Sequence, residues 1–151
     1  MRGLGILISI EGKRPVTVGV LLEGVAESCS GEEVYRHSGH AQDDLPEMLR
    51  SLADDLDSQL PLLNPNAVVI HSADWHPARP PSPIRQMAEG VVAAVARKHV
   101  QKVEVLNGKQ IGNRMKLGKE AVESNAASIL GQELKVSGSA ALAALSIAES
   151  G

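Results

Sequence analysis

Aromatic side chains are nearly missing from this sequence, which has one Trp, one Tyr and no Phe among its 151 residues. Leu, Ile, Val and Ala must therefore fill the core that a chain of this length can bury. Proteins that hold single-stranded nucleic acid by stacking its bases need several aromatic side chains, so a binding platform of that kind is excluded. The one tryptophan, Trp75, lies in a proline-rich stretch, and we expect it to pack against that loop.

Cysteine is equally scarce. Cys29 stands alone, so it can neither close an internal disulfide nor share a thiolate zinc site. The sequence has no apolar run of the roughly 18 residues that a membrane span needs, and its first residues show no signal-peptide pattern. These absences predict a cytoplasmic protein without a membrane partner, and the length predicts one domain over residues 1–151.

Positive charges are slightly outnumbered by negative ones overall, but many of them lie in one segment. The net charge is -3, and residues 23–57 hold ten acids, whereas residues 97–119 hold seven Lys or Arg against one Glu. Such a segment can form a local phosphate-binding face on an acidic protein, although charge runs are also commonly just solvated. We predict a nucleic-acid-binding patch from the cations in and just after a Gly-containing basic loop at 109–118, namely Lys109, Arg114, Lys116 and Lys119.

Strands are predicted from short runs of apolar and β-branched residues. The run 4–10 is apolar on both faces, which is typical of a strand buried in the middle of a sheet, and it ends at Glu11. Gly12 to Pro15 joins it to a second strand at 16–22, so the two should form an antiparallel hairpin. After a turn at 28–31, further strands are expected within 33–38 and at 67–70 and 103–106.

Helices are predicted from caps and from apolar residues at helical spacing. Asp44 and Glu47 have capping-box spacing, and five leucines repeat at intervals of 4, 3, 4 and 4 before Pro61 and Asn64-Pro65 stop the helix. Ser82 and Pro83 begin a second helix. A third helix should cover 119–130, and an Ala-rich helix at 137–150 should lie close against the sheet.

Polar chemistry is densest after the strand at 67–70, where His71 to His76 follow the apolar run. A helix that leads into a buried strand suggests that this strand runs parallel to the first one. Parallel strands end at the same edge of a sheet, so we expect Glu11 and His71 to lie close together. With Asp74 they could bind a divalent metal such as Mn²⁺ or Zn²⁺. Alternatively, His71 is a strand-end histidine without such a role.

The order of elements is that of an α/β, RNase H-like fold with a mixed five-stranded sheet. The sequence resembles the RuvC-type Holliday junction resolvases over nearly its whole length. Three stretches and one helix start carry the resemblance, namely Ile6 to Gly12, Leu45 to Ile70, the segment from Gly90 onward, and Lys119-Glu120-Ala121-Val122.

The resemblance implies four carboxylates around two divalent cations, and here it breaks down. Glu11 occupies the position at which the family has an Asp on its first strand. His71 occupies the position of the family's Glu, at the end of the strand predicted at 67–70. The family's Asp-Ala-Ala-Asp helix reads Ser137-Gly138-Ser139-Ala140. Mg²⁺ needs hard oxygen ligands, so two-metal catalysis should be lost unless other acids substitute, and the candidates are Asp74 and Glu149.

Three functions remain open at this point. The first is a catalytically degenerate RuvC-like domain that binds nucleic acid, with branched DNA as one candidate ligand, or serves assembly. The second is an active metal-dependent nuclease with a rebuilt site that uses Glu11, Asp74 and Glu149, with Mg²⁺ or Mn²⁺ held by Glu11, His71 and Asp74. The third is a protein-interaction subunit without nucleic acid. A homodimer is implied only by the resemblance.

Overall fold

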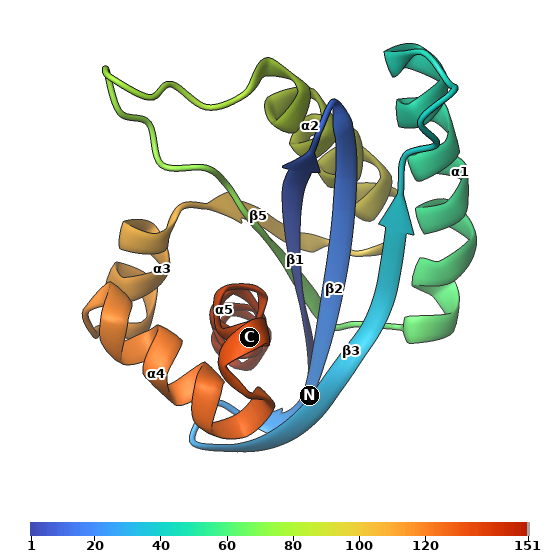
Figure 1. The fold of residues 1–151 in the computed structure, drawn as a ribbon. Coiled ribbons are helices and arrows are strands. Elements are labelled where there is room, and N and C mark those ends of the chain that lie inside the picture. Colours follow the sequence, from blue (N-terminus) through green and yellow to red (C-terminus); the bar gives the residue numbers. More distant parts are fainter. Residues whose placement is uncertain (151) are drawn as a thin grey trace.

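A mixed sheet of five strands with helices on both faces forms the centre of the computed structural model, which describes residues 1–150 (Figure 1). The strand order is β3-β2-β1-β4-β5. β1, β2 and β3 pair antiparallel, while β4 pairs parallel with β1 and β5 parallel with β4. The strands are β1 (Arg2–Glu11), β2 (Arg14–Val25), β3 (Ser28–Ser38), β4 (Ala67–His71) and β5 (Lys102–Leu106). The predicted fold class is therefore confirmed.

Two hydrophobic cores lie on the two faces of the sheet. Leu4, Ile6 and Ile8 of β1 pack on the side of α1 and α2, whereas the alternate positions of β1 face α5. This two-sided burial explains the nearly unbroken apolar run that predicted a central strand. The helices are α1 (Leu45–Leu63), α2 (Pro83–His99), α3 (Gly108–Met115), α4 (Lys119–Leu130) and α5 (Lys135–Glu149), with a 3₁₀ turn η1 (Gln132–Leu134) before α5.

Helix α5 lies unusually close to β1. A Cβ atom added to Gly3 would come 2.6 Å from the Leu145 nitrogen, and one added to Gly5 would come still closer to the Ser137 oxygen. The alanines of α5 that face the sheet are fully buried. Glycine on the strand and alanine on the helix thus allow the close packing that the Ala-rich sequence predicted.

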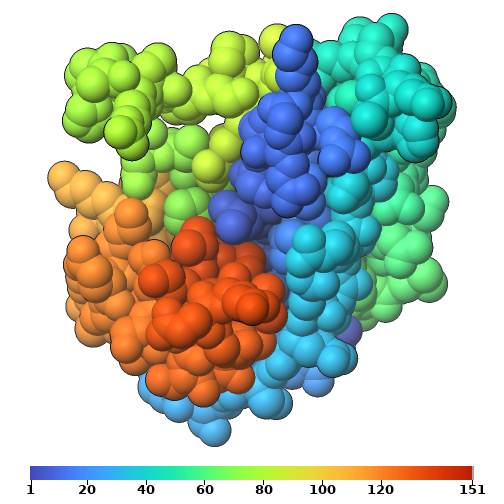
Figure 2. Space-filling view, viewed as in Figure 1, coloured from blue at the N-terminus to red at the C-terminus, as the bar shows by residue number. Residues whose placement is uncertain are grey.

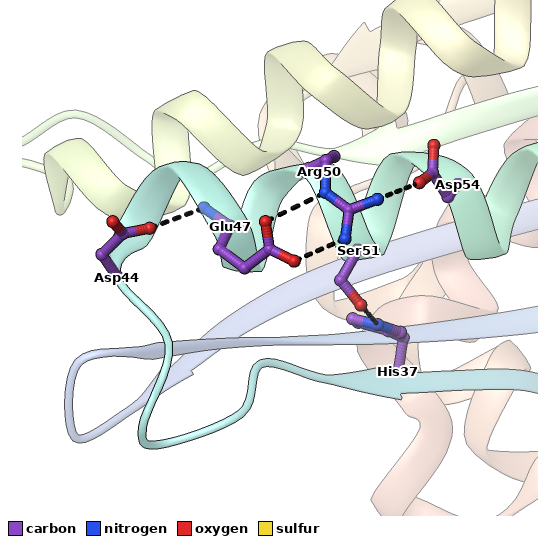
Figure 3. A network of polar contacts seen from close by, with 6 residues as sticks. All are labelled: His37, Asp44, Glu47, Arg50, Ser51 and Asp54. Atoms are coloured by element: carbon purple, nitrogen blue, oxygen red, sulfur yellow. Dashed lines mark hydrogen bonds and ion pairs between the residues drawn. The ribbon is translucent and has the colours of Figure 1, made fainter.

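The start of α1 is fixed by polar contacts (Figure 3). The Asp44 carboxylate accepts a hydrogen bond of 2.9 Å from the Glu47 nitrogen, and Arg50 Nε donates to Glu47 Oε2 over 2.9 Å. One turn further on, the Ser51 hydroxyl lies 3.1 Å from Nε2 of His37 on β3. The cap therefore sets where α1 begins, and the contact with β3 sets how it crosses the sheet.

Several predicted boundaries were wrong for local reasons. β3 begins at Ser28, so the turn predicted at 28–31 is part of a strand that extends the hairpin. α1 ends before Asn64-Pro65, as predicted, but it continues past Pro61 to Leu63, because a proline near the end of a helix loses only one hydrogen bond. The basic loop predicted at 109–118 is mostly helix α3, which Asn107 caps together with Gln110. Within residues 1–150, no helix is long and apolar enough to cross a membrane.

Candidate nucleic-acid interface

The sequence predicted a metal site at the end of the sheet where the parallel strands β1 and β4 finish. The two strands are adjacent and parallel, as predicted, and His71 pairs with Leu7. Glu11 lies four residues beyond Leu7, or about 13 Å at the usual rise of about 3.3 Å per residue. The prediction that Glu11 and His71 meet is wrong, because β1 runs on with β2 past the end of β4.

Glu11 instead belongs to the β1–β2 hairpin. There it lines a hollow of about 600 Å³ between the hairpin and the start of α1, together with Asp44 and Met48. This hollow has neither His71 nor Asp74 in its lining. The predicted metal ligands Glu11, His71 and Asp74 therefore do not converge.

Glu149 lies at the opposite edge of the sheet. Its Oε1 atom accepts a hydrogen bond of 2.7 Å from the Ala26 nitrogen, in the turn between β2 and β3. That turn is beside the start of β1, because α5 runs antiparallel to β1 and its last residues pass the strand's first ones. Glu149 therefore cannot complete a site with Glu11 and Asp74, and the rebuilt catalytic set is not assembled.

The first turns of α5 bring hydroxyl groups, not acids, toward the edge where His71 lies. Ser137 and Ser139 are buried, and each donates its hydroxyl hydrogen to a carbonyl of the preceding turn, that of Leu134 at 3.3 Å and that of Val136 at 2.7 Å. Within residues 1–150 no three His, Cys, Asp or Glu side chains are grouped so that they could hold a metal ion. With Leu7 opposite His71, the residues at this edge do not fit a pair of Mg²⁺ ions, which require oxygen ligands.

His71 is a buried imidazole with an unsatisfied nitrogen. Its side chain is 6% exposed, and its Nδ1 atom has no hydrogen-bond partner among residues 1–150. Burial lowers the pKa of His71 below its usual value, and the nearby Arg85 guanidinium lowers it further, while Asp74 opposes the change. Burial therefore favours the neutral form of the imidazole.

A buried ion pair on α2, which was not predicted from the sequence, holds the start of the loop after β4. Arg85 Nε lies 2.8 Å from Glu89 Oε2, and Glu89 is 7% exposed. Arg85 Nη2 also donates to the His71 carbonyl at 3.2 Å, and the same Glu89 oxygen accepts from the Ala73 nitrogen at 3.3 Å. The i,i+4 spacing of Arg85 and Glu89 could have predicted this ion pair. No pattern in the sequence predicts the contacts that the pair makes with the loop.

Three of the four predicted phosphate-binding cations lie on α3 or at its end, and Lys119 begins α4. All four side chains are exposed. Two of them already have acidic partners: Arg114 pairs with Glu104 of β5, and Lys119 Nζ lies 3.4 Å from Asp74 Oδ2. Lys109 and Lys116 form no ion pair within the part of the chain that the structure describes.

Two other cations of the basic segment contact other elements of the fold. Lys98 pairs with Asp57 of α1, and Lys102 donates to the carbonyls of the last turn of α5. In Figure 2 the loop between β4 and α2 projects above the orange helices α3 and α4 and leaves an open space beneath it. Trp75 in that loop is 68% exposed, so the prediction that it packs against the prolines is wrong.

Comparisons with known proteins identify the fold but not a sequence family. No family model and no curated protein matches the chain. The structure of Thermus thermophilus RuvC in complex with Holliday junction substrate is similar with a TM-score of 0.70, 16% identity, and coverage of 100% of this chain and 96% of that one. A second structure of T. thermophilus RuvC gives a TM-score of 0.67 at 17% identity, covering 95% of this chain and 92% of that one.

A third solved structure, the yeast mitochondrial Holliday junction resolvase Ydc2, is more distant. It gives a TM-score of 0.57 at 12% identity and covers 97% of this chain and 78% of that one. Identities this low establish architecture and nothing finer. The chain has a RuvC-like RNase H-type fold.

Proposed function

We propose that this chain is a catalytically degenerate RuvC-like domain that binds nucleic acid, branched DNA in particular. One observation carries the loss of catalysis. Where β1, β4 and the start of α5 meet, the chain has Leu7, a buried His71 and Ser137, and none of these can ligate a hard divalent cation as a carboxylate does.

Nucleic-acid binding is supported by exposed cations at the same end of the sheet. Lys109, Lys116 and Lys119 lie on α3, at its end and at the start of α4, on the α5 side of the sheet. One of the similar structures is a complex with Holliday junction DNA, which makes a four-way junction the first ligand to test. Phosphate contacts alone would give affinity without base specificity.

The two other functions can be weighed against the same geometry. A rebuilt nuclease site would need Glu11, Asp74 and Glu149 to meet, and their separation weighs against it. A protein-interaction subunit without nucleic acid is favoured by the ion pairs that already engage Arg114 and Lys119. Binding measurements separate this possibility from our proposal.

The test uses fluorescently labelled four-way junction DNA and a duplex of the same length. We expect the purified protein to bind the junction and to leave it intact in the presence of Mg²⁺ or Mn²⁺. Cleavage that EDTA abolishes and that Glu11→Ala removes would refute the loss of catalysis. If fluorescence anisotropy at low salt shows no binding to junction, duplex or single-stranded DNA or RNA, the protein-interaction function replaces our proposal.

The proposal also includes a homodimer, for which α2 offers a surface. Between Gln86 and Ala96 the only charged residue is Glu89, which is turned inward to Arg85. The outer side of α2 therefore presents Met87, 49% exposed, and Gly90, whose Cβ position has no neighbour within 4 Å. The middle of α2 thus has no charge on its outer side, and a second copy of the chain would cover this apolar surface.

A further inference from the structure

We propose that Asp74 acts as a latch on Lys119, so that the loop between β4 and α2 competes with nucleic-acid phosphate for this lysine. The inference rests on the proposed function and assigns a role to a residue that would touch no nucleic acid itself. In the free protein Lys119 Nζ lies 3.4 Å from Asp74 Oδ2. A phosphate that engages Lys119 must displace that carboxylate.

The Lys119 side chain reaches Asp74 by passing over the start of α3. A Cβ atom added to Gly108 would lie 2.7 Å from Lys119 Cε and 2.8 Å from its Cδ. The lysine side chain thus lies across the first residue of α3, where the missing Cβ of Gly108 leaves room for this path. This path over Gly108 leads the ammonium group of Lys119 toward the loop after β4.

The acidic side of the latch is also held in place. Asp74 follows Ala73, whose nitrogen donates to the buried Glu89, and two residues earlier the His71 carbonyl accepts from Arg85. The Arg85–Glu89 pair therefore fixes the backbone on which Asp74 is carried. Beyond Asp74 the loop stays exposed from Trp75 to Pro80.

The strength of the contact suits a latch that opens. The Lys119 and Asp74 side chains are 44% and 53% exposed, and exposed ion pairs of this kind contribute about 0.2–1 kcal/mol. Counterion release makes a DNA phosphate a stronger competitor at low salt. Asp74 would then lower the affinity of Lys119 for phosphate by a modest factor, because each phosphate contact must first displace the carboxylate.

The experiment is a double-mutant cycle on binding to the four-way junction, with Asp74→Asn, Lys119→Gln and the double variant. We expect Asp74→Asn to raise affinity about two- to fivefold, which is the range that about 0.4–1 kcal/mol corresponds to. In the Lys119→Gln background the same change should have less than half of that effect, because the competed cation is absent.

Asp54→Asn is the matched control. It also removes one carboxylate from an exposed ion pair, but it lies on α1, on the opposite face of the sheet from α4. It should leave junction affinity within about 1.5-fold of the wild type, because a charge beyond about one Debye length is largely screened. The latch would be overturned if Asp54→Asn and Asp74→Asn raised junction affinity equally, or if Asp74→Asn raised it just as much in the Lys119→Gln background. Either result would mean that the change in net charge alone explains the gain in affinity.

A second readout needs no nucleic acid. Trp75, the only tryptophan in the chain, follows Asp74 directly, so its fluorescence reports on the loop. Both Asp74→Asn and Lys119→Gln should lower its fluorescence anisotropy, whereas Asp54→Asn should not. If neither variant changes it, the latch is refuted even where DNA binds. If both lower it and the wild type binds no nucleic acid, the proposed function fails and the Asp74–Lys119 pair only tethers the loop.

Discussion

Replacing Gly5 by alanine should severely destabilise the protein, because this glycine sets the distance between β1 and α5. At Gly3 an added Cβ would lie 2.6 Å from the Leu145 nitrogen, which is 0.8 Å inside the 3.4 Å at which ordinary contact begins. At Gly5 the overlap with the Ser137 oxygen and the Ala141 nitrogen is greater. These are backbone atoms of a helix and cannot rotate away, so the helix as a whole must move.

The expected cost for Gly5→Ala is about 3 kcal/mol or more, at the upper end for overpacked cores. Urea unfolding followed by circular dichroism at 222 nm measures it, and the midpoint should fall with little change in slope. Gly118→Ala is the control, since its Cβ position is open and its φ of -72° suits any residue, so the midpoint should change far less than for Gly5→Ala. A Gly5→Ala variant within about 0.5 kcal/mol of the wild type would refute the close packing of α5 on β1.

Three further predictions concern charge and assembly. Replacing Lys116 and Lys119 by Glu should weaken binding to junctions of any sequence. It should also flatten the plot of log affinity against log salt concentration, whose slope for the wild type we expect to be roughly -3 for three or four phosphate contacts. If neither binding nor the slope changes, this patch does not bind DNA. Because the pKa of His71 is lowered in the folded state, the unfolded state binds a proton at this residue more readily as the pH falls. The free energy of unfolding should therefore fall as the pH drops below about 6.5. Urea titrations at pH 7.5 and 5 measure this loss, and His71→Gln should reduce it. Met87→Glu should convert a dimer to a monomer in light scattering, and a wild type that is monomeric at high concentration would exclude the α2 interface.

The fold could be predicted from the sequence because its signals are local and repeated. The apolar run at 4–10, the leucines of α1 and the alanines of α5 each fix a burial pattern within a few residues. Those patterns hold in the structure. The helix α3 was missed because its eight residues carry too few apolar side chains to show a period, and its capping residue Asn107 also reads as a turn before glycine.

The site was harder to predict, because it depends on how strands of unequal length pair. Side chains four residues apart on a strand point to the same face, so Leu7 and Glu11 satisfy the same alternation and the pattern cannot tell which one meets His71. β1 has ten residues and β4 has five, and the pairing begins with Gly3 opposite Ala67. The shorter strand therefore ends beside Leu7 while β1 carries Glu11 onward into the hairpin. The register between these distant strands decides which side chains come together in a site. That register cannot be predicted from the sequence of either strand alone.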